Sequence, residues 1–362
     1  MTLRHLALAE LLKQADFDDA DALPLAGDAS MRTYCRYRRH DGASLILMDH
    51  PPEFGSVIHF MRMAERLAVA GASVPQIIAA APAQGYLLLE DFGDETLSRA
   101  LAAHPESECD YYQTAITILC ALQKSHAAAL IADLPFYTDW VEGDFTYYQR
   151  ELSLFPEWYI PAVTGGKMPV MGQAPSPLTQ QFLDDIWPVF LQELAHLPPQ
   201  LVLRDYHVDN LMVLPNRTGI KSLGLLDFQD ALAGPGVYDV VSLLRDARRD
   251  VTKDVVTHCA RHYCAAMHYP QTQFARDFAL LSLQRNFKIL GLFVRLAWRD
   301  GKPQYLTHLP RIWRMIVEDS QALCEAWPGN EAQILDAWLH KNCPPAYRNF
   351  PLNPDFFTAQ HS

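Results

Sequence analysis

The sequence lacks long apolar runs, metal-type cysteine spacing and any excess of basic residues. No stretch approaches the ~20 consecutive apolar residues that a membrane-spanning helix needs, so we expect no membrane segment. The seven cysteines include no CxxC pair, which argues against zinc and dithiol motifs and is typical of thiols in a reducing cytoplasm. Lysine and arginine number 30 against 42 acidic residues, so no broad basic surface is expected for nucleic acid.

Internal repeats and low-complexity tracts are also missing. The remaining composition, 49% hydrophobic and 20% charged over 362 residues, is typical of a globular chain rather than a disordered one. That length exceeds what one ordinary core accommodates, and it predicts two lobes.

The first quarter of the chain is predicted to be a small antiparallel sheet that carries one helix. After an N-terminal helix at 3–15, strands are expected at 31–39, 44–48, 77–81 and 86–89. The Asp41-Gly42 dipeptide favours a hairpin between the first two strands. A helical period of apolar residues runs from 54 to 70, where Gly71 favours its end.

Beyond residue 91 the pattern becomes mostly helical. Long helices are expected at 109–129, 140–152 and 178–194, short strands at 201–204, 211–214 and 223–226, and helices again after 237. The chain is therefore predicted to have an α+β, bilobal, protein-kinase-like fold. Its N-lobe, residues 1–90, would bind the nucleotide, and its C-lobe, residues 91–362, would hold the catalytic loop, the metal site and the sugar-binding helices.

Three polar residues lie at the ends of the later short strands. Asp205 and Asn210 share the loop between two apolar segments, and Asp227 follows the next strand. Oxygen ligands suit Mg²⁺, which commonly uses one or two protein groups together with substrate phosphates. Each residue alone is an ordinary turn former, but the three in this order predict a centre for phosphoryl transfer.

These motifs, RDYHxxN followed by LLDFQD, resemble the catalytic and metal loops of the aminoglycoside phosphotransferase-like kinases, which are relatives of the protein kinases. The resemblance implies ATP and Mg²⁺ as cofactors. It implies Asp205 as the catalytic base, with Asn210 and Asp227 as metal ligands. It further implies a phosphate loop over 27–33 and a hinge over 89–92 that meets adenine. The nucleotide-binding residues would be Gly27, Asp28, Ser30, Arg32, Glu90 and Phe92.

A narrower likeness, to bacterial anomeric sugar kinases, is carried by the segments 27–32, 48–53, 150–159 and 227–231. It implies phosphorylation of the C1 hydroxyl of N-acetylmuramate or N-acetylglucosamine during cell-wall recycling. The candidate acceptor-binding residues are Glu151, Glu157, Trp158, Tyr159 and His207. Two alternatives stay open, because an aromatic cluster of this kind also suits a core and His207 also suits packing beneath its loop.

Two positions depart from the family pattern. Leu203 stands where a histidine usually precedes the catalytic aspartate, and Met48 stands where the third strand usually carries a phosphate-binding lysine. Either Arg32, on the neighbouring strand, supplies the positive charge in place of that lysine, since arginine binds phosphate in bidentate fashion, or the site is weakened. Glu65 on the first-lobe helix would then pair with Arg32 or remain a solvated charge.

Other charged residues admit two interpretations. Asp239 is expected to cap backbone amides at a helix start, and the resemblance implies that it also braces the catalytic loop. Arg245, Arg248 and Arg249 would either form a solvated face or attract an anionic acceptor. For the chain as a whole, a kinase for another small alcohol (an aminoglycoside, choline or homoserine) and a silent nucleotide-binding pseudokinase remain alternatives.

Overall fold

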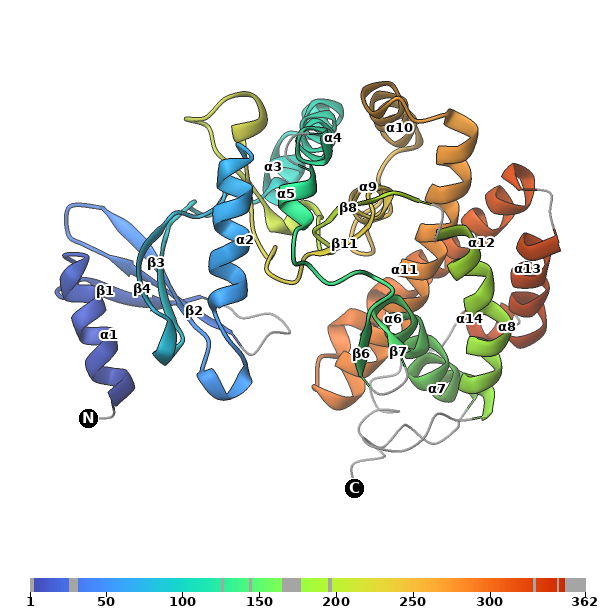
Figure 1. Cartoon of the computed structure of the whole chain (residues 1–362), viewed down its shortest axis with the longest axis horizontal. Helices are drawn as coiled ribbons and strands as arrows, with labels where there is room; N and C mark the ends of the chain where they lie inside the picture. The colour runs from blue at the N-terminus through green and yellow to red at the C-terminus, as the bar shows by residue number, and fades with distance from the viewer. Residues whose placement is uncertain are drawn as a thin grey trace. The chain divides into compact units, whose positions relative to one another are not determined.

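The computed structural model describes residues 3–25, 32–124, 127–142, 145–164, 177–194, 197–327, 330–343 and 345–348. These residues form two compact units. The first combines residues 1–132 with 203–231, and the second combines 133–202 with 232–362. Both units are drawn in Figure 1.

The first unit contains a five-stranded antiparallel sheet in the order β1-β2-β3-β5-β4. Its strands are Asp21–Pro24, Thr33–Arg38, Ser44–Asp49, Ile77–Ala81 and Tyr86–Glu90, numbered β1 to β5. Side chains alternate between the two faces of such a sheet. Leu45 and Leu47 therefore share a face and pack with α1, whereas Met48 belongs to the other face and is fully buried.

Five helices accompany this sheet. They are α1 (Leu3–Gln14), α2 (Ile58–Val69), α3 (Leu97–Ala103), α4 (Glu108–Lys124) and α5 (Ala127–Ile131). Figure 1 shows α1 and α2 on opposite sides of the sheet. The buried side of α2 is an apolar stripe at helical spacing, made by Phe60, Met63, Ala64 and Leu67, so its amphipathic pattern fixes which face meets the sheet.

A later segment of the chain completes the first unit. Strands β9 (Leu211–Val213) and β10 (Leu223–Leu225) form an antiparallel hairpin. The amide of Leu225 donates to the carbonyl of Ser73 at 2.8 Å, and the amide of Val213 donates to Glu95 O at 2.8 Å. These backbone bonds attach the predicted catalytic segment to the sheet-bearing unit, although more than a hundred residues separate the partners in sequence.

The second unit is mainly helical. Its strands are β6 (Trp140–Glu142), β7 (Phe145–Thr146), β8 (Pro199–Val202) and β11 (Leu232–Pro235), with β8 paired to β11. Its helices are α6 (Tyr147–Leu154), α7 (Ile160–Thr164), α8 (Pro177–Leu194), α9 (Val237–Leu244), α10 (Lys253–Met267), α11 (Gln271–Arg299), α12 (Leu309–Ala326), α13 (Asn330–Asn342) and α14 (Pro345–Arg348). A single π-helical turn, Phe155–Tyr159, joins α6 to α7.

The long helix α11 is the centre of the second unit. It packs against α6, α9, α12 and the π-helical turn, and most of its side chains are buried. Around the turn, Phe155 lies in an aromatic cluster with Tyr159, Phe182, Phe287, Trp313 and Trp338. Such aromatic packing supplies a large apolar area to the core.

The α+β, protein-kinase-like class predicted from the sequence is confirmed, but one helix was assigned wrongly. Residues 140–152 were expected to form one helix, whereas strands β6 and β7 occupy the first part and α6 begins only at Tyr147. A capping box explains the start: Thr146 accepts from the amide of Gln149, whose side chain accepts in turn from the amide of Thr146. The predicted lobe boundary near residue 91 remains a prediction.

Among the described helices, none combines the length and the apolar composition that crossing a membrane would require.

Candidate active site

The β9–β10 hairpin brings Asn210 and Asp227 to the same end. Leu211 pairs with Leu225 in the register, and the amide of Leu226 donates to the carbonyl of Asn210 at 2.9 Å. Asp227 follows directly. Its φ of 56° lies in the left-handed region, where a non-glycine residue costs free energy and where functional residues are enriched.

The loop that carries Asp205 is fixed by hydrogen bonds from its neighbours. Asn210 Nδ2 donates to the carbonyl of Asp205 at 2.9 Å and lies 3.3 Å from His207 Nε2. Tyr206 donates its hydroxyl to the carbonyl of Ala115 on α4 at 2.9 Å, in a buried position. Because its amide nitrogen is engaged, Asn210 offers its side-chain oxygen as the atom that would coordinate a cation.

Asp205 and Asp227 lie close enough for the charge of one to affect the pKa of the other. Burial raises the pKa of Asp227 above its usual value, and the negative charge of Asp205 raises it further. Asp230 adds to this effect, whereas Gln229 and Arg32 oppose it. A cluster of carboxylates that repel one another is a favourable place for a cation.

Gln229 is a residue of this site that was not singled out from the sequence. Its Nε2 donates to Asp227 Oδ1 at 2.7 Å and to Asp230 Oδ2 at 3.0 Å, and the residue is 7% exposed. Phe228, the residue between Asp227 and Gln229, packs on Phe60 of α2 with ring centroids 4.8 Å apart. The signal was available, because Gln229 lies within the quoted LLDFQD motif, but the sequence gives no hydrogen-bond partners.

Arg32 lies near the same carboxylates. Its Nη1 is 4.0 Å from Asp230 Oδ2. Tyr34, on the strand that follows, has its pKa raised to about 12, first by burial and then by Asp227 and Asp230, against the opposing charge of Arg32. The position of Arg32 therefore agrees with the expected replacement of the strand lysine, whose own position, Met48, is fully buried.

The expected partner of Arg32 on α2 is not found in contact with it. Glu65 is exposed, and no ion pair joins it to Arg32 in the described part of the chain. The solvated alternative therefore describes Glu65. Gly27, Asp28 and Ser30 of the predicted phosphate loop lie outside the described residues.

The predicted hinge is held by two arginines. Arg36 on β2 pairs with Asp91, with Nε 2.7 Å from Oδ2, and donates to the carbonyl of Gly93 at 3.0 Å. Arg217 forms an ion pair with Glu90 and stacks over the ring of Phe92, 5.2 Å from its centroid. Glu90 and Phe92 are thus fixed by their side chains, which positions the backbone between them.

The predicted acceptor residues lie in the second unit, except for His207. Glu151 is buried and accepts from Lys288 Nζ at 2.7 Å and from Gln284 Nε2 at 3.2 Å. Glu157 pairs with Arg150 at 2.8 Å. Both carboxylates therefore already have cationic partners on the protein. Lys288, which the sequence did not single out, makes the polar pocket around Glu151 electrically balanced.

Two of the other predicted acceptor residues are buried. Tyr159 is fully buried, accepts a hydrogen bond from Trp313 Nε1, and stacks on Phe155. Trp158 is 8% exposed. These contacts agree with the core alternative for the aromatic cluster. His207, 6% exposed and beside Asn210, agrees with packing beneath the catalytic loop.

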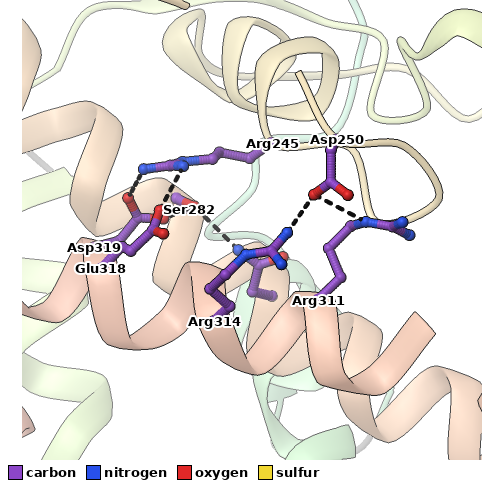
Figure 2. A network of polar contacts seen from close by, with 8 residues as sticks. Arg245, Asp250, Ser282, Arg311, Arg314, Glu318 and Asp319 are labelled. Atoms are coloured by element: carbon purple, nitrogen blue, oxygen red, sulfur yellow. Dashed lines mark hydrogen bonds and ion pairs between the residues drawn. The ribbon is translucent and has the colours of Figure 1, made fainter. Parts of the chain in front are cut away.

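Arg245 has an internal role that neither sequence interpretation anticipated. Figure 2 shows its guanidinium directed at Asp319 and Glu318 of α12, at 2.5 and 3.2 Å. Asp319 also accepts from Ser282 of α11. Arg245 therefore links the end of α9 to α12 through ion pairs. Asp239 is fully buried in the first turn of α9, and its role remains a prediction.

Comparison with known proteins agrees with this geometry. The sequence pattern of the phosphotransferase enzyme family matches residues 21–276. The chain is 34% identical over 304 residues to N-acetylmuramate/N-acetylglucosamine kinase of Pseudomonas aeruginosa, covering 82% of this chain and 83% of that protein. It is 31% identical over 328 residues to the protein of the same name from Neisseria meningitidis serogroup B, covering 89% and 91%.

The fold has relatives among solved structures as well. Choline kinase LicA from Streptococcus pneumoniae superposes with a TM-score of 0.55 over 89% of this chain and 99% of the other, at 12% sequence identity. At that sequence identity, the superposition shows a similarity of fold and nothing about function. The extent of the family match and the identity to the two bacterial relatives confirm the resemblance inferred from the motifs, and the chain belongs to the phosphotransferase enzyme family.

Proposed function

We propose that the protein transfers the γ-phosphoryl group of ATP to the C1 hydroxyl of an N-acetylated amino sugar, N-acetylmuramate or N-acetylglucosamine, in cytoplasmic recycling of peptidoglycan. The observation that carries the proposal is the convergence of Asp205, Asn210 and Asp227 at one end of the β9–β10 hairpin. The acceptor is supported by the names of relatives that align over most of both chains.

Asp205 is assigned to the acceptor. Its loop is held by Tyr206 and Asn210, so the backbone that carries its carboxylate is fixed. An anomeric hydroxyl is more acidic than an ordinary alcohol, and a carboxylate that accepts or orients its proton suffices for modest base catalysis. Positioning and charge neutralisation then account for most of the rate enhancement in phosphoryl transfer.

Asn210 and Asp227 are assigned to Mg²⁺. The oxygen donors suit a hard cation, and the raised pKa of Asp227 reflects a carboxylate that a cation would stabilise in its ionised form. In the described part of the chain no group of three or more His, Cys, Asp or Glu is arranged to hold a metal. Two protein ligands completed by phosphate oxygens and water are, however, the ordinary arrangement for Mg²⁺. When bound, the ion would neutralise the charge on the phosphates.

Arg32 and the hinge are assigned to the nucleotide. Arg32 lies beside Asp230, with Nη1 4.0 Å from Oδ2. A guanidinium matches phosphate oxygens in bidentate geometry. The hinge residues Glu90 and Phe92 are fixed by Arg217. The amide of Glu90 already donates to the carbonyl of Gln76 at 2.8 Å, so the other backbone groups of the hinge are assigned to adenine.

Substitution of Asp205 by Asn tests the assignment. The variant keeps the size of the side chain but loses the base, so kcat should fall by roughly 100-fold or more while MgATP still binds. Asp254→Asn, which removes an exposed carboxylate at the start of α10, is the matched control and should leave kcat unchanged. A near-normal kcat for Asp205→Asn would show that this residue is not the base.

The acceptor requires a separate measurement. Phosphorus and proton NMR of the product formed from each amino sugar should show a phosphate on C1. A phosphate on another hydroxyl, or turnover with neither sugar but with another small alcohol, would contradict the proposed acceptor and leave the assignment of Asp205 intact.

A further inference from the structure

The last turns of α11 carry an arginine that has no counter-ion. Arg295 makes no hydrogen bond or ion pair with any residue in the described part of the chain, and its Nε is inaccessible to solvent. The residue as a whole is only partly exposed. Leaving a charged group partly desolvated without a partner is costly, so this position needs an explanation.

The surroundings of Arg295 are positively charged. Arg150 and Arg299 lie close enough to lower its pKa, after the larger effect of burial. Two carboxylates are nearby, but each is already occupied, since Glu157 accepts from Arg150 at 2.8 Å and Asp300 accepts from Arg299 at 2.7 Å. Positive charge therefore exceeds negative charge here.

This excess contrasts with the rest of the molecule. The formal net charge of the chain is −12. Two other partly buried arginines pair with carboxylates, whereas the more deeply buried Arg285 donates to the hydroxyl of Ser242. Arg36 pairs with Asp91, and Arg245 pairs with Asp319. A guanidinium offers a planar pair of donors that matches a carboxylate in bidentate geometry. The arrangement is that of an anion site rather than of a structural ion pair.

We infer that Arg295, supported by Arg150 and Arg299, binds the carboxylate of an acidic amino sugar acceptor. The inference rests on the proposed function and deepens it, because N-acetylmuramate carries a lactyl carboxylate that N-acetylglucosamine lacks. Arg150 and Glu157 belong to the segment 150–159, whose sequence carries the likeness to sugar kinases. Arg32 and the hinge, assigned to the nucleotide, belong to the other compact unit.

The matched pair of sugars provides the test. Replacing Arg295 by Met keeps an unbranched apolar side chain but removes the charge. Charge-assisted hydrogen bonds contribute about 1.5–3 kcal/mol, so kcat/KM for N-acetylmuramate should fall roughly 10- to 100-fold. The same constant for N-acetylglucosamine should change by less than about threefold, and KM for ATP should stay the same. Arg261→Met, at an exposed arginine of α10, is the control and should alter neither sugar.

A substrate variant makes the test independent of protein folding. The methyl ester of N-acetylmuramate has no carboxylate charge, so the wild-type enzyme should use it about as poorly as Arg295→Met uses the acid. The ester and the substitution should not be additive. Arg295→Lys should recover part of the preference, and added salt should weaken the use of N-acetylmuramate selectively.

Several results would overturn the inference. They are an equal loss with both sugars, a selective rise in KM for ATP, unchanged kinetics, or a wild-type enzyme that treats acid and ester alike. Equal losses would assign Arg295 to folding, and a rise in KM for ATP would assign the anion site to nucleotide phosphate. Failure of the wild-type enzyme to phosphorylate either sugar would instead refute the proposed function.

Discussion

The hinge between sheet and helices depends on a buried arginine with two unequal carboxylate partners. The side chain of Arg36 is 8% exposed and that of Asp91 is 5% exposed, whereas that of Asp94 is 65% exposed. Arg36 meets Asp91 through two nitrogens, at 2.7 and 3.0 Å, and meets Asp94 through the third, at 2.8 Å. Replacing each acid by Asn in turn compares a buried and an exposed ion pair on the same guanidinium.

The two replacements should differ severalfold in free energy. Asp91→Asn leaves a buried charge without its main counter-ion, and breaking a buried pair in this way costs about 3–5 kcal/mol. Asp94→Asn removes a partner that water largely replaces, and exposed pairs contribute only about 0–1 kcal/mol. Because Asp91 also accepts from the amide of Gly93 at 2.9 Å, its loss should loosen the hinge itself and weaken ATP binding.

Urea unfolding measures how much free energy of unfolding each variant loses, and amide hydrogen exchange over residues 33–38 and 90–94 shows where the structure is loosened. Titration with MgATP measures the loss of ATP binding expected for Asp91→Asn.

The pH dependence of stability adds an independent check. Burial alone would raise the pKa of Asp91, but hydrogen bonds from Ser44 and Arg36 hold it below its usual value. The stability that it confers should be complete at neutral pH and should be lost as the pH falls below the ordinary aspartate pKa of about 4. Equal losses of stability in Asp91→Asn and Asp94→Asn would refute the reasoning.

Two further predictions concern the second unit. Gly291→Ala should lower the free energy of unfolding by roughly 2 kcal/mol or more, because the new Cβ would lie 2.0 Å from the carbonyl oxygen of Leu154. This clash outweighs the gain of about 1 kcal/mol in helix propensity. An unchanged urea midpoint would contradict the prediction. Burial, only partly opposed by Arg245, raises the pKa of Asp319 to about 6. Its contribution to stability should therefore be fully present below pH 4 and be lost as the pH rises to about 6. Asp319→Asn should remove this slope from the stability profile, and an unaltered slope would assign the titration to another group.

Motifs in this sequence predicted the catalytic segment because they combine a local pattern with local geometry. Asp205, Asn210 and Asp227 each lie at the end of a short apolar strand, and a hairpin between those strands necessarily brings two of them to one end. The Asp41-Gly42 turn and the apolar stripe of α2 are local in the same sense. Whether that turn and that helix form depends on neighbours within a few residues, so both could be predicted from the sequence.

The remaining features depend on partners that are distant in sequence. Tyr159 and Trp158 suited both a sugar face and a core in the sequence. The burial of Tyr159 and the packing of Phe155 against α11 favour the core. Lys288 and Arg295 gave no signal, because a basic residue in a long amphipathic helix is usually solvated. Their significance follows from burial and from which carboxylates lie nearby, neither of which periodicity encodes.

The residues to which we assign roles are divided between the two compact units. Every described residue assigned to ATP, Mg²⁺ or the base, from Arg32 to Asp227, belongs to the first unit, although the chain leaves that unit after Ala132 and returns at Leu203. The intervening residues and those after Leu232 build the second unit, which holds Arg295 and the segment around Glu151. Sequence change in the second unit can therefore alter which alcohol is recognised without disturbing the hydrogen bonds that hold the catalytic loop. The substitutions Asp205→Asn and Arg295→Met should accordingly affect different kinetic properties, the first lowering turnover for every acceptor and the second changing only the choice between acceptors.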